Sequence, residues 1–336
     1  MNDTAYVKIV SPLFPTKALE AFMLFNLFCI EITAILGIIG NGVSIVVFAR
    51  QGFKDSINVT LAVLAASDIG ALVTNQMFGL LNNPWFQKSN LPIDYSGVAT
   101  MLVYIPHNYF SKVCGFVTAF ASFERCLCVL APLQVKQIIT RNVAIVVNST
   151  ICVLMLLDFV PSYYIYYLDW VFIPATNQTK LLKLSRVDPI NVFSKSLYVT
   201  EFTLPYLTFF FIIVTTVVIG IQLKGRLLWR KTVTLINKDA GFKSLNKEMH
   251  AVQMLAVVSV VFVVCLTPQT LVITIAAFFP EVSHSEIYYN IFLFCYSLSY
   301  LLETVSSSVN PLVYYNMSGR YRKTFFVVLD VFLHLP

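Results

Sequence analysis

Charged side chains are scarce in this sequence. Asp, Glu, Lys and Arg make up only 12% of its 336 residues, whereas hydrophobic residues make up 57%, and the mean hydropathy is +0.75. Soluble globular domains carry about 25% charged residues. The composition therefore excludes an ordinary soluble domain and predicts a protein of the membrane.

Several motifs of enzymes and nucleic-acid-binding proteins are also absent. The sequence has no Cys or His pairs at zinc-finger spacing, no glycine-rich phosphate loop and no nucleophile elbow. All seven cysteines fall within apolar runs, and we expect them to be free thiols that pack as small apolar side chains. We therefore expect no enzymatic activity and no nucleic-acid partner.

Long apolar runs are the main feature that is present. A helix needs about 20 residues, at 1.5 Å per residue, to cross a hydrocarbon core of ~30 Å. Backbone polar groups in lipid must find partners within their own segment, so such runs must be helices. Seven runs reach the required length, roughly at 21 to 48, 57 to 81, 96 to 130, 143 to 167, 197 to 223, 251 to 279 and 288 to 315. The sequence thus predicts an all-α membrane protein, with a tail over residues 1–20 and a single seven-helix transmembrane bundle over residues 21–316.

Lys and Arg are shared unevenly between the two sides of this bundle. Fourteen lie in the loops after the first, third and fifth helices and in the tail after the seventh, against seven on the opposite side. By the positive-inside rule we expect a multi-pass protein of the plasma membrane with an extracellular N-terminus. Glycosylation sequons at Asn2 and Asn177 fall on the predicted outer side. The basic inner side is expected to attract anionic membrane lipid.

Polar residues and prolines inside the apolar runs carry the next signal. A polar residue at the bilayer centre costs a few kcal/mol and is retained for packing or function. Proline removes a backbone hydrogen bond and kinks or loosens its helix. The polar residues are Asn41 in GNGVSIVVF, Asp68 in LAVLAASDIGAL, Arg125 in FERCLCVLAPL and Asn310 in SVNPLVYY, and the prolines are Pro205, Pro268 and Pro311.

Taken in order, these residues resemble the motifs of rhodopsin-type (class A) G protein-coupled receptors, and the resemblance covers nearly the whole chain. The matches are Asn41 in the first helix, Leu64, Ala65 and Asp68 in the second, Glu124-Arg125-Cys126 for Asp-Arg-Tyr in the third, Pro205 in the fifth, Phe262, Cys265 and Pro268 in the sixth, and Asn310-Pro311-Leu312-Val313-Tyr314 in the seventh. The run FERCLCVLAPLQVKQIIT is similar to chemosensory and neuropeptide receptors of invertebrates such as molluscs. The resemblance implies a receptor that binds an extracellular ligand and promotes nucleotide exchange on a heterotrimeric G protein.

The resemblance also implies an activation switch. Arg125 is expected to pair with Glu124 and Glu248 in the resting state, tying the third helix to the sixth, and to be freed for the G protein when an agonist lets the sixth helix swing outward. The other switch residues are Phe262, Pro268, Asn310, Pro311 and Tyr314. The alternative is that the Glu-Arg pair only marks the lipid headgroup boundary, with Arg125 snorkelling toward it.

A polar centre of the bundle is expected around Asp68 and Asn310, together with Asn41 and Ser307. This centre either holds a sodium ion or a water cluster, or consists of a plain interhelical hydrogen bond. The sequence leaves these alternatives open. Apart from sodium, we expect no cofactor and no metal.

Ionisable residues are unusually dense in the outer halves of the predicted helices. Lys112 is expected to pair with Asp158 or Glu201, leaving His107 and Glu303 to address a ligand. We assign His107, Lys112, Glu201 and Glu303 to ligand binding, because a site with both signs of charge suits a small zwitterion or a neuropeptide better than a steroid. The alternative is a network of buried ion pairs that satisfy one another without touching a ligand.

Several positions depart from the family pattern. Thr100 stands where the family has one cysteine of its outer disulfide, and residues 168–196 contain no second cysteine. Leu266 and Ile213 replace a tryptophan and a tyrosine, so the usual aromatic toggle is not expected. Thr304 replaces the lysine that binds retinal in opsins, which excludes a Schiff-base photoreceptor.

The C-terminal stretch SGRYRKTFFVVLDVFLHL mixes basic and large apolar residues. Over residues 317–336 it predicts a short amphipathic helix in the inner interface, followed by a short cytoplasmic tail.

The competing function for the whole chain is a seven-helix transporter or channel with no G-protein coupling. Such proteins often contain inverted repeats, and this sequence shows no internal repeat.

Overall fold

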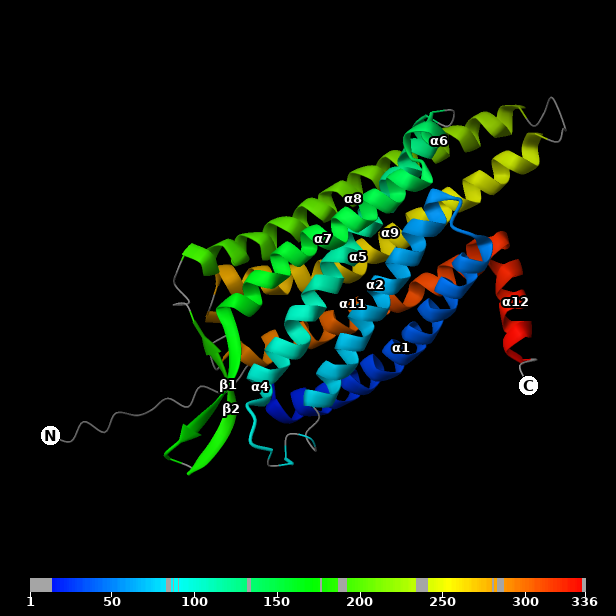
Figure 1. The fold of residues 1–336 in the computed structure, drawn as a ribbon. Helices are drawn as coiled ribbons and strands as arrows, with labels where there is room; N and C mark the ends of the chain where they lie inside the picture. Colours follow the sequence, from blue (N-terminus) through cyan, green and yellow to red (C-terminus); the bar gives the residue numbers. More distant parts are fainter. Residues whose placement is uncertain are drawn as a thin grey trace.

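Seven long helical segments form one bundle in the computed structural model (Figure 1). The structure describes residues 14–82, 86, 88–89, 91–131, 134–175, 177–186, 192–233, 241–279, 281–282 and 287–333. The segments are α1 (Thr16–Gln51), α2 (Ser56–Asn82), the continuous run of α4 (Tyr95–Ala99), η1 (Thr100–Tyr104) and α5 (Ile105–Leu130), then α7 (Arg141–Ile165), α8 (Val192–Val233), α9 (Gly241–Phe278) and α11 (Tyr289–Met317). The seven-helix bundle predicted from the sequence is confirmed.

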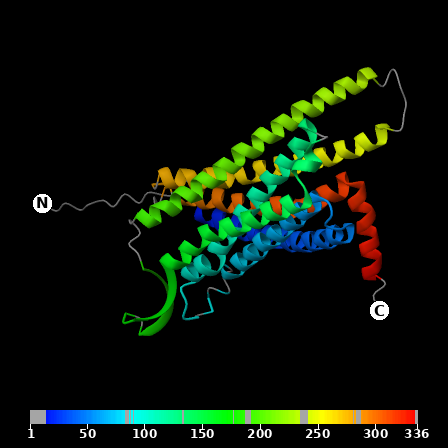
Figure 2. The same cartoon turned by 45° about the horizontal axis from the view of Figure 1, so that its top comes forward.

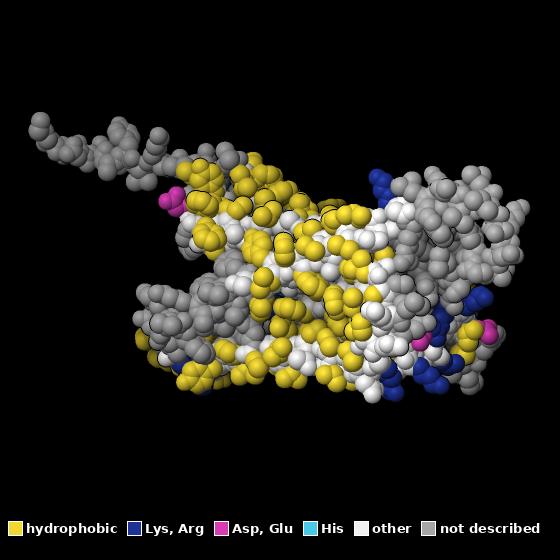
Figure 3. Space-filling model, turned by 90° about the horizontal axis from the view of Figure 1, so that it is seen from above, with side chains coloured by type: hydrophobic (Ala, Val, Ile, Leu, Met, Phe, Trp, Pro, Cys, Tyr) yellow, Lys and Arg dark blue, Asp and Glu magenta, His cyan; other side chains and the backbone are white. Residues whose placement is uncertain are grey.

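The surface of the bundle has an apolar middle and a basic end. Six of the described helices are long and apolar enough to cross a membrane. The seventh, α11, is less apolar because it buries polar side chains such as Ser299, Glu303 and Asn310. Figure 3 shows hydrophobic side chains over the middle of one face, with Lys and Arg gathered at the end where α12 lies. This distribution suits a protein whose middle is surrounded by lipid.

An antiparallel hairpin connects α7 to α8. Its strands are β1 (Tyr166–Ile173) and β2 (Gln178–Ser185), with Tyr166 opposite Ser185 and Ile173 opposite Gln178. The hairpin is bound to the chain before α4, because Asp94 N donates to Leu181 O at 2.8 Å and Leu181 N donates to Pro92 O at 2.9 Å. The sequence analysis continued the fourth helix to residue 167 and predicted no strand. The aromatic and β-branched residues of β1 favour a strand once β2 supplies a partner.

The hairpin also rests on the outer end of the third segment. Lys183 Nζ donates to Thr100 Oγ1 at 3.5 Å, and a Cβ atom built on Gly97 would lie only 2.7 Å from Lys183 Cβ. Glycine at 97 therefore lets β2 approach closely. All seven cysteines are free, so hydrogen bonds and close packing hold the hairpin in place.

The third segment contains a π-helical turn that the sequence analysis did not predict. Residues 96–130 were expected to form one regular helix, but η1 separates α4 from α5. Pro106 follows directly, at the start of α5. Proline has no N–H to donate and its ring collides with the carbonyl four residues earlier, so the helix widens before it. The wide turn changes the register between the outer end of the segment and α5.

Several helices extend beyond the predicted apolar runs. α1 begins at Thr16, within the predicted tail of residues 1–20. α8 continues past residue 223 to Val233, and α9 begins at Gly241, before residue 251. Figure 2 shows α8 and α9 projecting beyond the other helices at the end opposite the hairpin. The apolar run marks only the part in lipid, whereas helix-forming Leu, Lys and Arg continue the helix outside it.

Two short helices lie at the same end as the α8 and α9 projections. α6 (Val135–Ile138) follows α5, and α12 (Gly319–Leu333) follows α11 and confirms the predicted C-terminal helix. Arg320 Nη1 lies 2.7 Å from Asp55 Oδ2, and the Tyr321 hydroxyl lies 2.8 Å from Ser44 Oγ. Phe326 and Val327 are exposed, as expected for a helix whose apolar face lies against lipid.

Candidate functional site

The Glu-Arg pair of the predicted switch is formed near the C-terminal end of α5. Arg125 Nη2 lies 3.8 Å from Glu124 Oε1, and both side chains are largely buried. Glu124 Oε1 also accepts a hydrogen bond of 2.5 Å from Ser56 Oγ, on the first turn of α2. Glu248 lies on α9, but its side chain is outside the described part of the structure. Its pairing with Arg125 stays a prediction.

Phe262 on α9 occupies the middle of the bundle, about two turns before Pro268. Its ring packs at 82° against Phe209 of α8, with ring centroids 6.0 Å apart. A Cβ atom on Gly115 would lie 3.3 Å from Phe262 Cζ and equally close to Thr208 Cγ2. Because Gly115 has no side chain, the Phe262 ring fits closely against α5. A shift of α9 would therefore displace α5, and a shift of α5 would displace α9.

The predicted polar centre is assembled from four helices. Asn310 Nδ2 donates to Asp68 Oδ2 at 2.8 Å, and Asn41 Nδ2 donates to the carbonyl oxygen of Ser307 at 2.8 Å. The Cys114 thiol donates to Asp68 Oδ1 at 3.3 Å. These contacts join α1, α2, α5 and α11 in the interior, where an unpaired polar group would be costly.

The donors around Asp68 favour the hydrogen-bond alternative over a sodium ion. One carboxylate oxygen faces the Cys114 thiol and the other faces the Asn310 amide. A hard cation prefers oxygen ligands, which a thiol does not supply. The Ser307 side chain also hydrogen-bonds to Asp68. The residues present therefore satisfy the carboxylate among themselves, and sodium binding stays a prediction.

Pro311 and Tyr314, two further residues of the predicted switch, lie near the C-terminal end of α11. Tyr314 is fully buried. Its ring centroid lies 5.5 Å from that of Phe48 on α1 and 5.8 Å from that of Tyr321 on α12. Tyr314 therefore connects the transmembrane bundle to the C-terminal helix.

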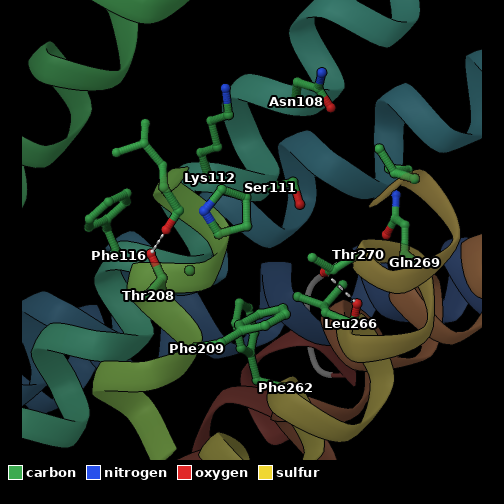
Figure 4. A pocket seen from close by; sticks show the side chains of 14 residues that line it. Asn108, Ser111, Lys112, Phe116, Thr208, Phe209, Phe262, Leu266, Gln269 and Thr270 are labelled. Atoms are coloured by element: carbon green, nitrogen blue, oxygen red, sulfur yellow. Dashed lines mark hydrogen bonds between the residues drawn. The ribbon is translucent and has the colours of Figure 1, made fainter. Parts of the chain in front are cut away.

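A pocket opens between α5, α8 and α9 on the hairpin side of Phe262 (Figure 4). Its empty volume is about 680 Å³, including space that opens out of the bundle. Phe209 and Phe262 lie at one end, and Lys112 and Asn108 lie at the other. Of the four residues assigned to ligand binding, Lys112 lines this pocket.

His107 and Glu303 lie beside the pocket and bind each other. His107 Nε2 is 3.1 Å from Glu303 Oε1, and both side chains are almost completely buried. Ser111, which lines the pocket, donates to the same carboxylate oxygen at 2.7 Å. The sequence analysis predicted that His107 and Glu303 contact a ligand directly. In the structure they contact each other, and Ser111 lies between Glu303 and the pocket. Asp158 and Glu201 were predicted as partners of Lys112. Their side chains lie outside the described part of the structure.

The hydrogen-bond pattern around His107 requires a proton between His107 and Glu303. The Thr74 hydroxyl lies 3.0 Å from the oxygen of Gly70 and 2.7 Å from that of Ala71, so its hydrogen is used there. His107 Nδ1, 3.0 Å from Thr74 Oγ1, must then be the donor in that contact. Nε2 faces a carboxylate oxygen, so a second proton sits on the imidazole or on Glu303. Either arrangement leaves the buried pair neutral overall.

Three examples of interhelical polar contacts that the sequence analysis missed lie among the described residues. Each member is a polar residue inside an apolar run, and this signal was present in the sequence, but only ionisable residues and residues that matched a family motif were singled out. The contacts are Asn75 Nδ2 to Thr304 Oγ1 at 3.0 Å, Asn148 Nδ2 to Thr60 Oγ1 at 3.1 Å, and Ser122 Oγ to Ser259 Oγ at 2.6 Å.

Of the two predicted glycosylation sites, Asn177 is described. It lies exposed in the turn between β1 and β2, with a φ of 49°, a left-handed conformation that asparagine adopts more readily than most residues. Asn2 lies outside the described residues. Modification of either residue stays a prediction.

Comparison with known proteins gives one family and several similar receptors. The family described as 7 transmembrane receptor (rhodopsin family) matches residues 40–314. The growth hormone secretagogue receptor type 1 of Sus scrofa is 26% identical over 98% of this chain and 85% of its own length, and that of Homo sapiens is 26% identical over 88% and 78%. The FMRFamide peptide receptor frpr-18 of Caenorhabditis elegans is 23% identical over 89% of this chain and 68% of its own length.

The matched segment contains the polar centre at Asp68, the Glu-Arg pair at Arg125 and the pocket above Phe262. The family and the similar proteins are receptors, and they give no support to the transporter or channel alternative. They bear out the resemblance seen in the sequence motifs. The chain is therefore a multi-pass membrane receptor, and it belongs to the rhodopsin family of G protein-coupled receptors.

Proposed function

We propose that the protein is a plasma-membrane receptor that binds an extracellular peptide and promotes nucleotide exchange on a heterotrimeric G protein. The observation that carries this proposal is the pocket between α5, α8 and α9, which joins a polar opening at Lys112 to an aromatic end at Phe262. The name of one similar protein, the FMRFamide peptide receptor, supports a peptide ligand. A small zwitterionic chemosensory cue is the second candidate, because the same charged groups suit it.

The chemistry of the pocket favours a ligand with both charges and amide groups. Lys112 supplies a cation for an acidic group. Asn108, Ser111 and Gln269 supply hydrogen-bonding groups that match peptide amides. Ser111 donates a hydrogen bond to the buried Glu303 carboxylate. This carboxylate suits a basic group of the ligand. A steroid offers few hydrogen-bonding groups that match these side chains.

The switch residues give a route from this pocket to the G protein. A ligand that presses on Phe262 and Leu266 acts on α9, because both residues line the pocket from that helix. α9 contains Pro268, which removes a backbone hydrogen bond and makes the helix easier to bend. An outward swing of the cytoplasmic half of α9 would then release Arg125 and expose the inner ends of α5 and α8.

The orientation follows from the distribution of charge. Arg50, Arg141, Arg320 and Arg322 all lie on segments at the end of the bundle that carries α12, opposite the hairpin. We place this end in the cytoplasm, where anionic lipid attracts cations, and the hairpin and N-terminus outside. The projecting parts of α8 and α9 then face the G protein.

A guanine-nucleotide exchange assay without ligand tests the coupling. Membranes that carry the wild type, Arg125→Ala or Glu248→Ala are compared against a panel of G proteins at equal surface expression. We expect Glu248→Ala to raise basal exchange and Arg125→Ala to abolish it. If all three proteins give the same exchange with every G protein, the coupling proposal is wrong.

A peptide screen tests the ligand class. Short peptides that stimulate the wild type are applied to Lys112→Gln and to Lys180→Gln, which removes the same charge from the hairpin strand β2. We expect Lys112→Gln to lose the response and Lys180→Gln to keep it. Equal responses from the two variants would contradict a ligand contact at Lys112, and a response to small amino-acid cues alone would favour the second candidate.

A further inference from the structure

A hydrogen bond between two serines joins α5 to α9 in the bundle interior. The Oγ atoms of Ser122 and Ser259 are 2.6 Å apart, and the residues are only 1% and 2% exposed. Ser299, by comparison, bonds to the carbonyl of Cys295 in its own helix at 2.7 Å. The contact between Ser122 and Ser259 links two helices that must separate if α9 swings outward.

The position of this contact connects the pocket to the cytoplasmic switch. Ser259 lies one turn before Phe262 on α9, and Ser122 lies one turn before Arg125 on α5. Residues three apart on a helix share a face. The serine contact therefore lies between the aromatic end of the pocket and the Glu-Arg pair.

Among the described side chains, which do not include Glu248, Arg125 contacts residues of its own helix. Its contacts are with Glu124 at 3.8 Å and with Cys128 Sγ at 3.9 Å, and both partners belong to α5. Val258 and Phe262, which lie close to Ser259 in the sequence of α9, are buried as well. A separation of the two serines beyond hydrogen-bond distance removes this contact between the helices.

We propose that Ser122 and Ser259 form an uncharged clamp that holds α9 against α5 in the resting receptor and opens when the receptor is activated. The inference rests on the proposed function, because it concerns the step at which α9 moves. Hydrogen bonds between membrane helices favour the bonded state about three-fold on average. The clamp therefore shifts the resting population by a modest factor and leaves room for an agonist to overcome it.

Alanine variants with a matched control test the clamp in the exchange assay. Ser122→Ala, Ser259→Ala and the double variant each remove the bond while deleting only one oxygen per site. We expect each to raise basal exchange about three-fold, with the double variant no higher than either single one, since the two serines act as one contact. Ser299→Ala removes a hydroxyl of equal burial that bonds within its own helix, and we expect it to leave exchange unchanged.

A distance measurement tests the clamp without any G protein. Spin labels are attached through keto amino acids introduced at Leu130 on α5 and Val257 on α9, which are 51% and 38% exposed, so that the native cysteines are untouched. In the double alanine variant we expect a larger population at longer label separation than in the wild type. Thermal unfolding of the same samples is recorded in parallel.

The outcomes separate the clamp from the proposed function. If the label distances lengthen but no G protein responds in any variant, the clamp stands and the coupling proposal is wrong. If Arg125→Ala changes exchange while the serine variants change neither exchange nor distance, coupling stands and the clamp is overturned. A lower unfolding temperature with unchanged distances would also overturn it, because the serines would then only stabilise the fold.

Discussion

Ser56 Oγ donates a hydrogen bond of 2.5 Å to Glu124 Oε1 and thereby ties the start of α2 to the end of α5. Glu124 is almost fully buried, and its partner Arg125 is no closer than 3.8 Å. Glu124 Oε2 has no hydrogen bond among the described residues. Arg125 therefore supplies the nearby positive charge, and Ser56 supplies the short hydrogen bond.

Ser56→Ala is expected to destabilise the receptor by about 1–3 kcal/mol, because it removes a donor from a buried charged group. Thermal unfolding of the purified protein in detergent measures the effect. Ser67→Ala is the control, since the Ser67 hydroxyl bonds to carbonyls of its own helix at 3.0 and 2.9 Å. Equal unfolding temperatures for the two variants would show that Glu124 does not depend on Ser56.

Two substitutions of Glu303 are expected to differ widely. Glu303→Gln retains a group that can donate to His107 Nε2 once the imidazole is neutral, so we expect a small loss of stability. Glu303→Ala removes one partner of a buried pair, which typically costs 3–5 kcal/mol. Unfolding temperatures of the two variants give the comparison. A Gln variant as unstable as the Ala variant would contradict the proton arrangement derived from Thr74 and His107.

Gly97→Val is expected to lift the hairpin from the third segment. A Cβ atom at this position would lie 2.7 Å from Lys183 Cβ and 3.1 Å from Lys183 N, so β2 must move. Hydrogen exchange of a peptide covering residues 178–185 should become faster, because the bond from Leu181 N to Pro92 O is weakened. Gly220→Val on α8, where a Cβ meets nothing within 4 Å, should leave this exchange unchanged.

The two anchors of α12 are expected to differ in strength. The ion pair of Arg320 and Asp55 is about half exposed, so Arg320→Ala should cost no more than about 1 kcal/mol. Tyr321 is 3% exposed and packs between Phe48 and Tyr314, so Tyr321→Ala should cost about 3–5 kcal/mol. Limited proteolysis after Met317 and thermal unfolding measure both effects. A larger loss for Arg320→Ala would mean that charge, not burial, fixes α12.

The apolar runs predicted the seven helices because the length that lipid requires is visible within any window of about 20 residues. The same signal stops at the edge of lipid, which is why the end of α8 was placed too early and the start of α9 too late. The hairpin was missed because its strand β1 is rich in aromatic and apolar residues that resemble a membrane boundary. Its pairing with β2 depends on contacts that no local pattern encodes.

The candidate site was predictable only where a motif fixed the partners. Asp68 and Asn310 were expected to meet, and they do. The pairing of His107 with Glu303 was not predicted, because it depends on how α5 is rotated relative to α11. The π-helical turn before Pro106 changes the helical register just before His107. Pro106 was visible in the sequence, but its effect on the neighbouring side chains required coordinates.

The hairpin is held by hydrogen bonds and by the close approach at Gly97, and all cysteines are free. Folding of this region therefore needs no oxidation or disulfide reshuffling, steps that take seconds to hours, whereas hairpins form within about 1–10 μs. A reductant has no bond to break there. The hairpin can loosen from the third segment by local thermal fluctuation, so the rate at which it loosens is set by temperature and is independent of the redox state of its surroundings.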